Sequence, residues 1–512
     1  MAGFHIENFG CRAARADAEA VSAHLRAAGY DEQQPATANL VIVNTCSVTA
    51  EADRAARAFI RRSHRRNPDA RIVVTGCYAQ RAPAELTALP GVCAVVGNSH
   101  KAMVPQIILG LENLKSEERL SQGTTSVVPQ TLLDMRRASA PAGPGAFIPA
   151  HTLTAPQSAA GPTQWVDDTF AHSFIETPDL TAGSLTRPNL KIQEGCTNRC
   201  TFCVIPQTRG GSRSLSADSI LSKVRAFVAA GGNELVLSGI NLGRWGRDLT
   251  QAPGIPSNFA ALVRNILTDT DLPRLRLSSI EPMDWDTDLI ALVAEFARPE
   301  AGSRLAPHAH LPLQSGSDAV LRRMHRRYRP WHYEQKVQAL LDAAGPDLTL
   351  GADVMVGFPG ETDAEFAETF DFIQRLPFGY LHLFPFSPRP ATRAWALHAA
   401  EPVPKPVVED RMAALRALTA EKTRAHRMSF LGRTLPAITL HTPSALGRTG
   451  AHTSALTANF LRVEVEAKLS PNLLIDVQIA RVGPDGAVHA ELAAKVKLQQ
   501  DGSQYTATAM SV

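Results

Sequence analysis

Short apolar runs alternate with amphipathic helical segments along most of this chain. In the second half the runs lie at residues 234–241, 274–279, 308–312, 349–357 and 380–385. Strands that alternate with helices form parallel sheets, because each helix carries the chain back to begin the next strand alongside the last. The alternation therefore predicts an α/β protein with a partial parallel α/β barrel in this half.

The first hundred residues show the same alternation, and a cysteine ends each predicted strand. Cys11 ends the run that begins at residue 4, Cys46 the run from residue 40, and Cys77 the run from residue 71. The carboxyl ends of strands in such a sheet line one crevice, so we expect the three thiols to converge. Any one of them alone would be better explained as a small buried hydrophobic residue. Three equivalent placements favour a site.

A second trio, Cys196, Cys200 and Cys203, is spaced C-x3-C-x2-C and offers three thiolates without a fourth. A structural zinc ion takes four nitrogen or sulfur ligands, and no other Cys or His lies within twenty residues on either side. Iron–sulfur clusters take Cys thiolates, and a cluster held at three irons leaves the fourth open to a molecule with amino and carboxylate groups. Incidental or structural cysteines are the alternative.

The run around this second trio resembles the cluster loop of the radical S-adenosylmethionine enzymes. Phe202 and the continuation 204–206 to Arg209-Gly210 are similar to one branch, the methylthiotransferases. The resemblance extends to stretches at 10–11, 44–49, 75–80, 313–317, 353–362 and 384–390. It is lost at Ala14, where the family usually has Asn, and resumes at Asp17 and Glu19.

The resemblance implies two 4Fe-4S clusters and S-adenosyl-L-methionine as cofactors. The cluster on Cys196, Cys200 and Cys203 would donate an electron to S-adenosylmethionine, giving methionine and a 5′-deoxyadenosyl radical that abstracts hydrogen. An auxiliary cluster on Cys11, Cys46 and Cys77 would supply sulfur, methylated by a second S-adenosylmethionine. An electron donor such as a flavodoxin or ferredoxin is implied, and the sulfur donor is not indicated.

Stretches 44–49 and 75–80 are most similar to the enzymes that methylthiolate carbon 2 of N6-threonylcarbamoyladenosine at position 37, in the anticodon loop of tRNA. Two alternatives are methylthiolation of isopentenyladenosine in tRNA and of an aspartate in a ribosomal protein. A non-catalytic iron–sulfur protein that binds RNA is a hypothesis from another class, and it would consume no S-adenosylmethionine.

Strand ends of the predicted barrel supply candidates for the cofactor pocket, because such barrels place their sites at the carboxyl ends of the strands. With Phe202 of the cluster loop, the candidates are Gly239, Asn241, Ser278, Glu281, Gln314 and Asp353. Gly239 could instead serve a turn, and Ser278 or Gln314 could cap a helix. No general acid–base pair stands out.

Composition and pattern divide the chain into four parts. Residues 1–113 form the N-terminal α/β domain, 187–428 the barrel, and 429–512 a small β-barrel that resembles the family's RNA-binding TRAM domain, of OB-like architecture. Strands are predicted at 457–466 and 473–479, and a generic β-domain is the alternative. Residues 114–186 are rich in Ala, Pro, Ser, Thr and Gly, which predicts a mobile linker or insertion, with Trp165 and Phe170 as possible anchors.

Charge and cysteine usage limit the partners and the compartment. The net charge is +3, so RNA binding would depend on local patches. Arginines between 54 and 66 form one candidate patch and residues 321–329 another, although most charge runs are simply solvated. No signal peptide or membrane-spanning run is recognised, which predicts a cytoplasmic protein without a membrane partner. Cys93 is expected to be a buried structural thiol.

Overall fold

The computed structural model describes residues 3–111, 162–170, 173–174, 186–249, 258–299, 302–441, 452–493, 497–501 and 504–508. Most of the predicted insertion at 114–186 lies outside these residues. The chain divides into two compact units, one comprising residues 1–176 with 207–210 and the other 177–206 with 211–512. Among the described helices, none is both long and apolar enough to span a bilayer.

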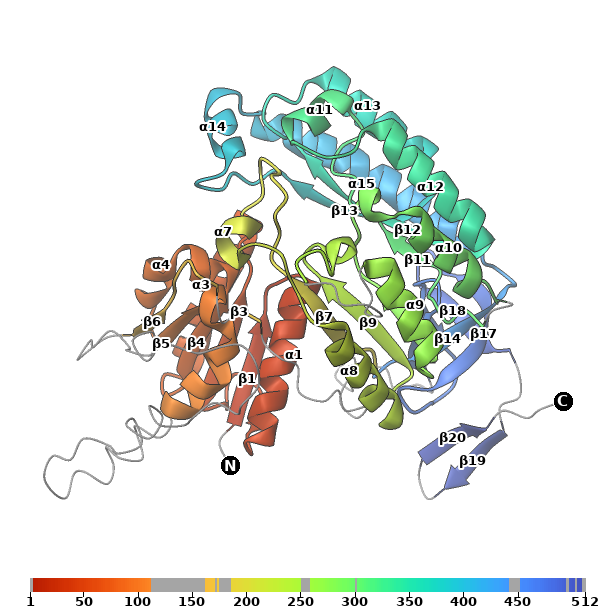
Figure 1. Cartoon of the computed structure of the whole chain (residues 1–512), viewed down its shortest axis with the longest axis horizontal. Helices are drawn as coiled ribbons and strands as arrows, with labels where there is room; N and C mark the ends of the chain where they lie inside the picture. The colour runs from red at the N-terminus through yellow and green to blue at the C-terminus, as the bar shows by residue number, and fades with distance from the viewer. Residues whose placement is uncertain are drawn as a thin grey trace, which may run out of the picture. The chain divides into compact units, whose positions relative to one another are not determined.

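The first unit is built on a six-stranded sheet in the order β2-β1-β3-β4-β5-β6 (Figure 1). All its paired strands are parallel, as the alternation predicted. Its strands are β1 (Gly3–Asn8), β2 (Asp31–Glu32), β3 (Leu40–Thr45), β4 (Arg71–Gly76), β5 (Val92–Gly97) and β6 (Thr163–Trp165). Its helices are α1 (Arg12–Ala27), α2 (Ala50–Arg66), α3 (Cys77–Arg81), α4 (Pro83–Thr87) and the 3-10 helix η1 (Asn98–Met103).

Both faces of this sheet are buried. Leu40 and Ile42 of β3 pack in one core with Leu25 of α1, whereas Val41 and Val43 pack in another with Ile60 of α2. Consecutive strand residues point to opposite faces, so a run that is apolar at every position requires cover on both sides. The continuous run of β3 therefore explains why helices flank the sheet on both faces.

The predicted anchors of the insertion are ordered parts of the first unit. Trp165 ends β6, lies opposite Val96 of β5 and packs against the core that contains Leu25. Phe170 is buried and adopts a left-handed backbone conformation with φ 53°. Cys93 lies on β5 and is half-buried, and its thiol donates a hydrogen bond to the Ile72 carbonyl at 3.4 Å.

The second unit contains the partial barrel, formed by a sheet in the order β10-β9-β7-β8 and a sheet in the order β11-β12-β13. Backbone hydrogen bonds join Leu275 of β10 to residues 304 and 306, in the segment that leads into β11. Its strands are β7 (Asn189–Glu194), β8 (Arg213–Ser214), β9 (Glu234–Gly239), β10 (Arg274–Leu277), β11 (His308–His310), β12 (Thr349–Val356) and β13 (Phe378–Pro385). Its helices are α7 (Ile205–Arg209, whose end belongs to the first unit), α8 (Ala217–Ala229), α9 (Phe259–Asp269), α10 (Thr287–Phe296), α11 (Asp318–Arg323), α12 (Pro330–Ala344), α13 (Asp363–Arg375), α14 (Arg393–Ala400) and α15 (Lys405–Met428), with 3-10 helices η3 (Leu242–Arg244), η4 (Pro282–Asp284) and η6 (Gly345–Asp347).

All five strands predicted for the barrel are present, and each is parallel to its paired neighbours. β7, which leads into the cluster loop, was not singled out as a strand. The two-residue β8 was also missed, and it pairs with β7 in the antiparallel sense. A strand this short carries almost no periodic signal, so only the neighbouring strand reveals it.

A closed five-stranded barrel follows, in the order β14-β15-β16-β18-β17. Its strands are β14 (Thr434–Thr439), β15 (Thr453–Thr457), β16 (Arg462–Val465), β17 (Leu474–Val482) and β18 (Val488–Leu492), and a separate hairpin joins β19 (Lys497–Asp501) to β20 (Gln504–Thr508). The small C-terminal β-barrel is therefore confirmed. The single strand predicted at 457–466 is wrong, because Phe460 turns the chain with φ 73° between β15 and β16.

Candidate metal centres and cofactor pocket

The N-terminal cysteines converge at one edge of the six-stranded sheet. Cys11 is the N-cap residue of α1, Cys46 directly follows β3, and Cys77 is the first residue of α3. Burial raises the pKa of the Cys46 thiol, and negative charge on Cys77 and Cys11 adds to the increase, giving a pKa of about 12. Because β1, β3 and β4 are neighbouring parallel strands, the three cysteines that follow them lie at the same edge of the sheet.

Residues of the two signature stretches fix these strand ends. Gly76 has φ 100°, and a Cβ there would lie 2.3 Å from the backbone oxygen of Thr45. The Thr45 hydroxyl donates to the Thr75 carbonyl at 2.6 Å. Such a contact and such a backbone conformation both require glycine. The Thr-Gly-Cys sequence therefore allows β4 to approach β3 closely where both strands deliver a ligand.

Ala14 occupies a tight position beside Gly10. It is buried, and a Cβ added at Gly10 would lie 2.2 Å from the Ala14 Cβ. The Asn44 amide donates to the Ala14 carbonyl at 2.6 Å and to Asn8 Oδ1 at 3.0 Å. Backbone geometry at Ala14 therefore helps to hold β3, although the Asn side chain usual in the family is missing.

Two donors point at the Cys77 sulfur. Asn98 Nδ2 and Arg209 Nε each lie 3.3 Å from it. Arg209 also contacts the Asp17 carboxylate, which Lys101 Nζ contacts at 2.6 Å. Sequence comparison had matched Asp17 and Arg209 to the family without giving either a role. Their separation along the chain left no local signal that they would meet at this thiol.

The second trio is gathered by the loop after β7. Burial raises the pKa of the Cys203 thiol, and negative charge on Cys200 and Cys196 adds to the increase, giving a pKa of about 12. Burial likewise raises the pKa of Cys196. The Asn198 backbone N–H lies 3.4 Å from the Cys196 sulfur and Asn241 Nδ2 lies 3.7 Å from it. The Cys203 backbone N–H donates to the Cys200 carbonyl at 3.2 Å, so the loop turns tightly between these two cysteines.

Arg326 was predicted to belong to an RNA-binding patch, but it lies beside the cluster loop. Its guanidinium is buried, donates two hydrogen bonds to the Glu281 carboxylate at 2.8 and 2.7 Å, and places NH1 3.3 Å from the Cys200 sulfur. Tyr328 is fully buried beneath it. The prediction of an exposed RNA-binding patch at 321–329 is therefore wrong for these two residues, and Glu281 is confirmed only as a neighbour of the cluster loop.

Gly239 and Asn241 are linked through Gln193, a residue that was not predicted. A Cβ at Gly239 would lie 3.0 Å from the Gln193 Cβ, and Gln193 Oε1 accepts the Asn241 backbone N–H at 2.7 Å. The buried Asn241 Oδ1 has no hydrogen-bond partner in the described structure. The absence of a side chain at Gly239 therefore leaves room for the Gln193 side chain. Asn241 places an unpaired acceptor oxygen beside Cys196 in the described structure.

The capping alternatives for Ser278 and Gln314 are wrong. The N-cap positions of the next helices belong to Glu281 for η4 and Ser317 for α11. Gln314 is buried with φ 66°, its backbone bonds to β12, and its Oε1 has no partner among the described residues. Ser278 is buried at the end of β10, and Phe202 packs against the barrel core. Helix capping therefore does not explain the positions of Ser278 and Gln314.

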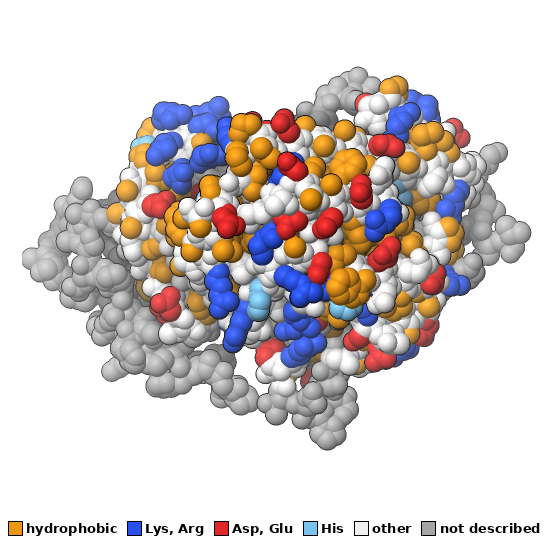
Figure 2. All heavy atoms as spheres, turned by 90° about the horizontal axis from the view of Figure 1, so that it is seen from above, with side chains coloured by type: hydrophobic (Ala, Val, Ile, Leu, Met, Phe, Trp, Pro, Cys, Tyr) orange, Lys and Arg blue, Asp and Glu red, His pale blue; other side chains and the backbone are white. Residues whose placement is uncertain are grey.

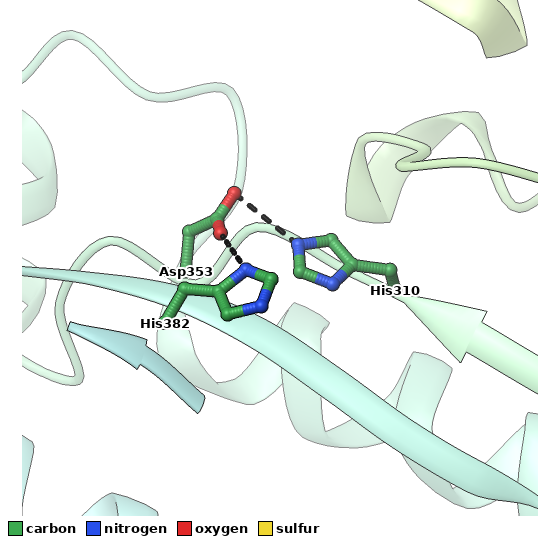
Figure 3. Close-up of side chains that lie close together, drawn as sticks. All are labelled: His310, Asp353 and His382. Atoms are coloured by element: carbon green, nitrogen blue, oxygen red, sulfur yellow. Dashed lines mark hydrogen bonds and ion pairs between the residues drawn. The ribbon is translucent and has the colours of Figure 1, made fainter. Parts of the chain in front are cut away.

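Asp353 lies between two imidazoles from the neighbouring strands (Figure 3). His310 Nε2 is 3.2 Å from one carboxylate oxygen and His382 Nδ1 is 3.2 Å from the other. Burial would raise the pKa of Asp353, but the hydrogen bonds from both histidines outweigh it and hold the pKa well below its usual range. Tyr380 bonds to the other ring nitrogen of His310 at 3.1 Å. The two histidines were not predicted; His382 lies directly opposite Asp353 in the register of β12 and β13, and His310 ends β11 opposite Gly351.

The donor set fits an iron–sulfur cluster better than a single zinc ion. All seven cysteines are free thiols. Among the described residues, His310, Asp353 and His382 bring three ligand atoms within 4.8 Å of one another. The sulfurs of neither thiol trio are all this close together in the described structure. Tetrahedral zinc at about 2.3 Å would bring sulfurs to roughly 3.8 Å from one another. Three spread thiols with N–H donors aimed at sulfur match the environment of a larger cluster.

Comparison with known protein families gives two separate matches along the chain. The family described as "Uncharacterized protein family UPF0004" matches residues 3–97, and the Radical SAM superfamily matches residues 190–373. Each match contains one of the two thiol trios.

Curated relatives match most of the chain. A Bacillus subtilis protein named Threonylcarbamoyladenosine tRNA methylthiotransferase MtaB is 32% identical over 441 residues, covering 86% of this chain and 85% of the relative. A protein of the same name from Aquifex aeolicus is 30% identical, covering 93% and 99%. A Lawsonia intracellularis tRNA-2-methylthio-N(6)-dimethylallyladenosine synthase is 32% identical, covering 76% and 77%.

Proposed function

Because this chain belongs to the radical S-adenosylmethionine methylthiotransferase family, we propose that it inserts a methylthio group at carbon 2 of N6-threonylcarbamoyladenosine at position 37 of tRNA. The observation that carries this proposal is the presence of two separate three-thiol sites in one chain. Cleavage of S-adenosylmethionine by itself would need only the site in the loop after β7, which leaves the second site available for sulfur.

The six cysteines would hold two 4Fe-4S clusters, Cys196, Cys200 and Cys203 one of them and Cys11, Cys46 and Cys77 the other. When bound, the clusters and S-adenosylmethionine supply reductive cleavage, hydrogen abstraction and the sulfur. The protein contributes burial, orientation and hydrogen bonds to sulfur. Cys46 and Cys77 of one site and Cys196 of the other are buried, which limits the access of water to these thiols.

Arg326 and Glu281 suit the methionine end of S-adenosylmethionine. That end carries an amino group and a carboxylate, and the pair presents a cation and an anion next to Cys200. A guanidinium matches carboxylate geometry. We therefore expect Arg326 to face the cofactor carboxylate and Glu281 to accept from the amino group.

The remaining pocket candidates offer acceptors. The oxygens of Asn241 and Gln314 are buried without partners among the described residues, and a buried acceptor of this kind is normally satisfied by a ligand or water. Phe202, Gly239, Ser278 and Asp353 complete the set that we propose for the S-adenosylmethionine pocket.

For tRNA binding, the helix α2 provides an exposed basic surface. Arg54, Arg61, Arg62, Arg65 and Arg66 are exposed on it. Figure 2 shows basic side chains gathered in separate groups among neutral and acidic ones, consistent with a net charge of only +3. Contacts between Arg and phosphate supply most non-specific affinity for nucleic acid. We propose that this surface of α2 contacts the tRNA backbone.

The finer assignments follow from this proposal. A flavodoxin or ferredoxin would deliver the electrons. The protein would act in the cytoplasm, where its tRNA substrate is present. The domain division that we propose is 1–113, 114–186, 187–428 and 429–512.

The second candidate substrate is isopentenyladenosine in tRNA. It has support because the dimethylallyladenosine synthase from Lawsonia is as similar in identity as the Bacillus relative, at 32%. The stretches 44–49 and 75–80 favour the threonylcarbamoyl substrate.

A competition assay tests the choice. The full-length protein is reconstituted anaerobically with iron and sulfide, reduced, and given equal amounts of two tRNAs that carry either N6-threonylcarbamoyladenosine or isopentenyladenosine. We expect 2-methylthio product from the first tRNA only. Product from the second tRNA alone would transfer the assignment to the isopentenyl reaction, and S-adenosylmethionine cleavage without either product would refute tRNA methylthiolation.

A further inference from the structure

Arg209 comes from the chain segment that follows the second thiol trio, yet it packs inside the first unit. It lies six positions after Cys203, and residues 207–210 belong to the compact unit that contains Cys77. Its side chain is 1% exposed, and its Nε donates to the Cys77 sulfur at 3.3 Å. A buried guanidinium is costly unless anionic or hydrogen-bonding groups surround it.

The guanidinium of Arg209 is held in a fixed orientation. NH1 and NH2 contact Asp17 Oδ2 at 3.4 and 3.3 Å, and Lys101 Nζ contacts the same oxygen at 2.6 Å. Asp17 and Lys101 are both almost completely buried. With its two terminal nitrogens turned toward this carboxylate, the planar guanidinium leaves Nε directed at Cys77.

Asn98 provides a neutral donor to the same sulfur. Its Nδ2 lies 3.3 Å from the Cys77 sulfur and 2.7 Å from the Thr208 carbonyl. One amide therefore fixes both the thiol and the segment that carries Arg209. The two donors differ mainly in charge, which allows their effects to be separated.

We propose that Arg209 is a positioning residue that raises the reduction potential of the auxiliary cluster by donating a charged hydrogen bond to Cys77. The proposal rests on the cluster assignment made under the proposed function. Hydrogen bonds to sulfur and local charge are among the factors that set the potential of iron–sulfur clusters. A positive charge favours the reduced cluster, which carries one more electron, so its removal lowers the midpoint potential.

The measurement is a redox titration of the auxiliary cluster, followed by electron paramagnetic resonance. The full chain carries Cys196→Ala, Cys200→Ala and Cys203→Ala, so that only the N-terminal site binds a cluster. Arg209→Gln should make the reduced-to-oxidised ratio at a fixed potential at least tenfold smaller, which is 59 mV for one electron. Arg209→Lys and Asn98→Ala should produce smaller shifts in the same direction.

Arg26→Gln is the matched control, because it removes the same charge from an exposed position on α1. Iron content is measured on every variant. A role limited to holding the segment would lower iron content in Arg209→Gln while the bound fraction keeps its potential, and that result would overturn the proposal. If the parent with native Arg209 binds no cluster, the assignment of Cys11, Cys46 and Cys77 fails instead.

Discussion

The N-terminal thiols come from three separate strand ends, whereas the other three come from one loop of eight residues. The first site exists only when β1, β3 and β4 are paired in register. The loop site depends on local chain geometry and on the barrel beneath it. A defect in sheet pairing should therefore remove one site and leave the other.

Both sites nevertheless use the same device around sulfur. Arg209 faces Cys77 and is held by Asp17, and Arg326 faces Cys200 and is held by Glu281. In each case a carboxylate, buried in Asp17 and half-buried in Glu281, holds a guanidinium against a cysteine sulfur. The two sites thus differ in scaffold and share their immediate electrostatics.

The largest expected effect separates the two sites by chemistry. Cys200→Ala should abolish release of 5′-deoxyadenosine, because the loop site can no longer hold its cluster. Cys77→Ala should preserve that release and abolish methylthiolation. Both products are quantified by liquid chromatography and mass spectrometry from one reaction. Loss of cofactor cleavage in both variants would mean that the sites do not act separately.

A smaller effect tests the dependence on sheet geometry. Gly76→Ala places a Cβ against Thr45 in a backbone conformation that alanine avoids, so we expect it to lower the free energy of unfolding by more than about 2 kcal/mol. It should also reduce iron at the N-terminal site.

The matched control is Gly211→Ala in the other unit, where the nearest atom would be Thr197 Cγ2 at 3.8 Å. Chemical denaturation and iron analysis provide the readouts. Equal behaviour of the two variants would contradict a sheet-dependent site.

The smallest effect concerns acid stability of the second unit. Burial, with a contribution from Arg427, lowers the pKa of His426 on α15 to about 4. Since folding favours the neutral imidazole, its stabilisation is complete above about pH 6.5 and is lost as pH falls toward 4. We expect a decrease of about 2 kcal/mol across this window.

His426→Gln keeps a polar group near Thr349, which His426 contacts at 2.9 Å, and removes the titration. Its unfolding free energy should vary less between pH 7 and 4 than that of the parent protein. Parallel curves for the two proteins would exclude this histidine as the source.

Only part of each thiol site could be predicted from the sequence. The C-x3-C-x2-C loop could be predicted because its cysteines are close together in sequence. The N-terminal cysteines could be predicted because each follows an apolar strand run. Asn241 and Gln314 follow β9 and β11, as the strand ends predicted, whereas Asp353 lies within β12 and not at its end. The contacts that complete each site were hidden, since Arg209 meets Asp17 across 192 positions and Arg326 meets Glu281 across 45.

The charge run at 321–329 is explained in part by ion pairs rather than by an exposed surface. The stretch 321–329 contains five arginines, and arginine is the cation most suited to burial beside a carboxylate. Arg323 and Arg326 each pair with a glutamate. Density of positive charge in sequence does not distinguish such pairs from an RNA-binding surface. Only the positions of the acidic partners do.

The most direct test is made in cells that lack their own threonylcarbamoyladenosine methylthiotransferase. This chain is supplied on a plasmid, beside a matched version with Cys77→Ala, and nucleosides from total tRNA are analysed by mass spectrometry. We predict that the parent chain restores 2-methylthio-N6-threonylcarbamoyladenosine and that the variant does not. If neither restores it while the parent protein is present with its iron, tRNA methylthiolation at this adenosine is contradicted.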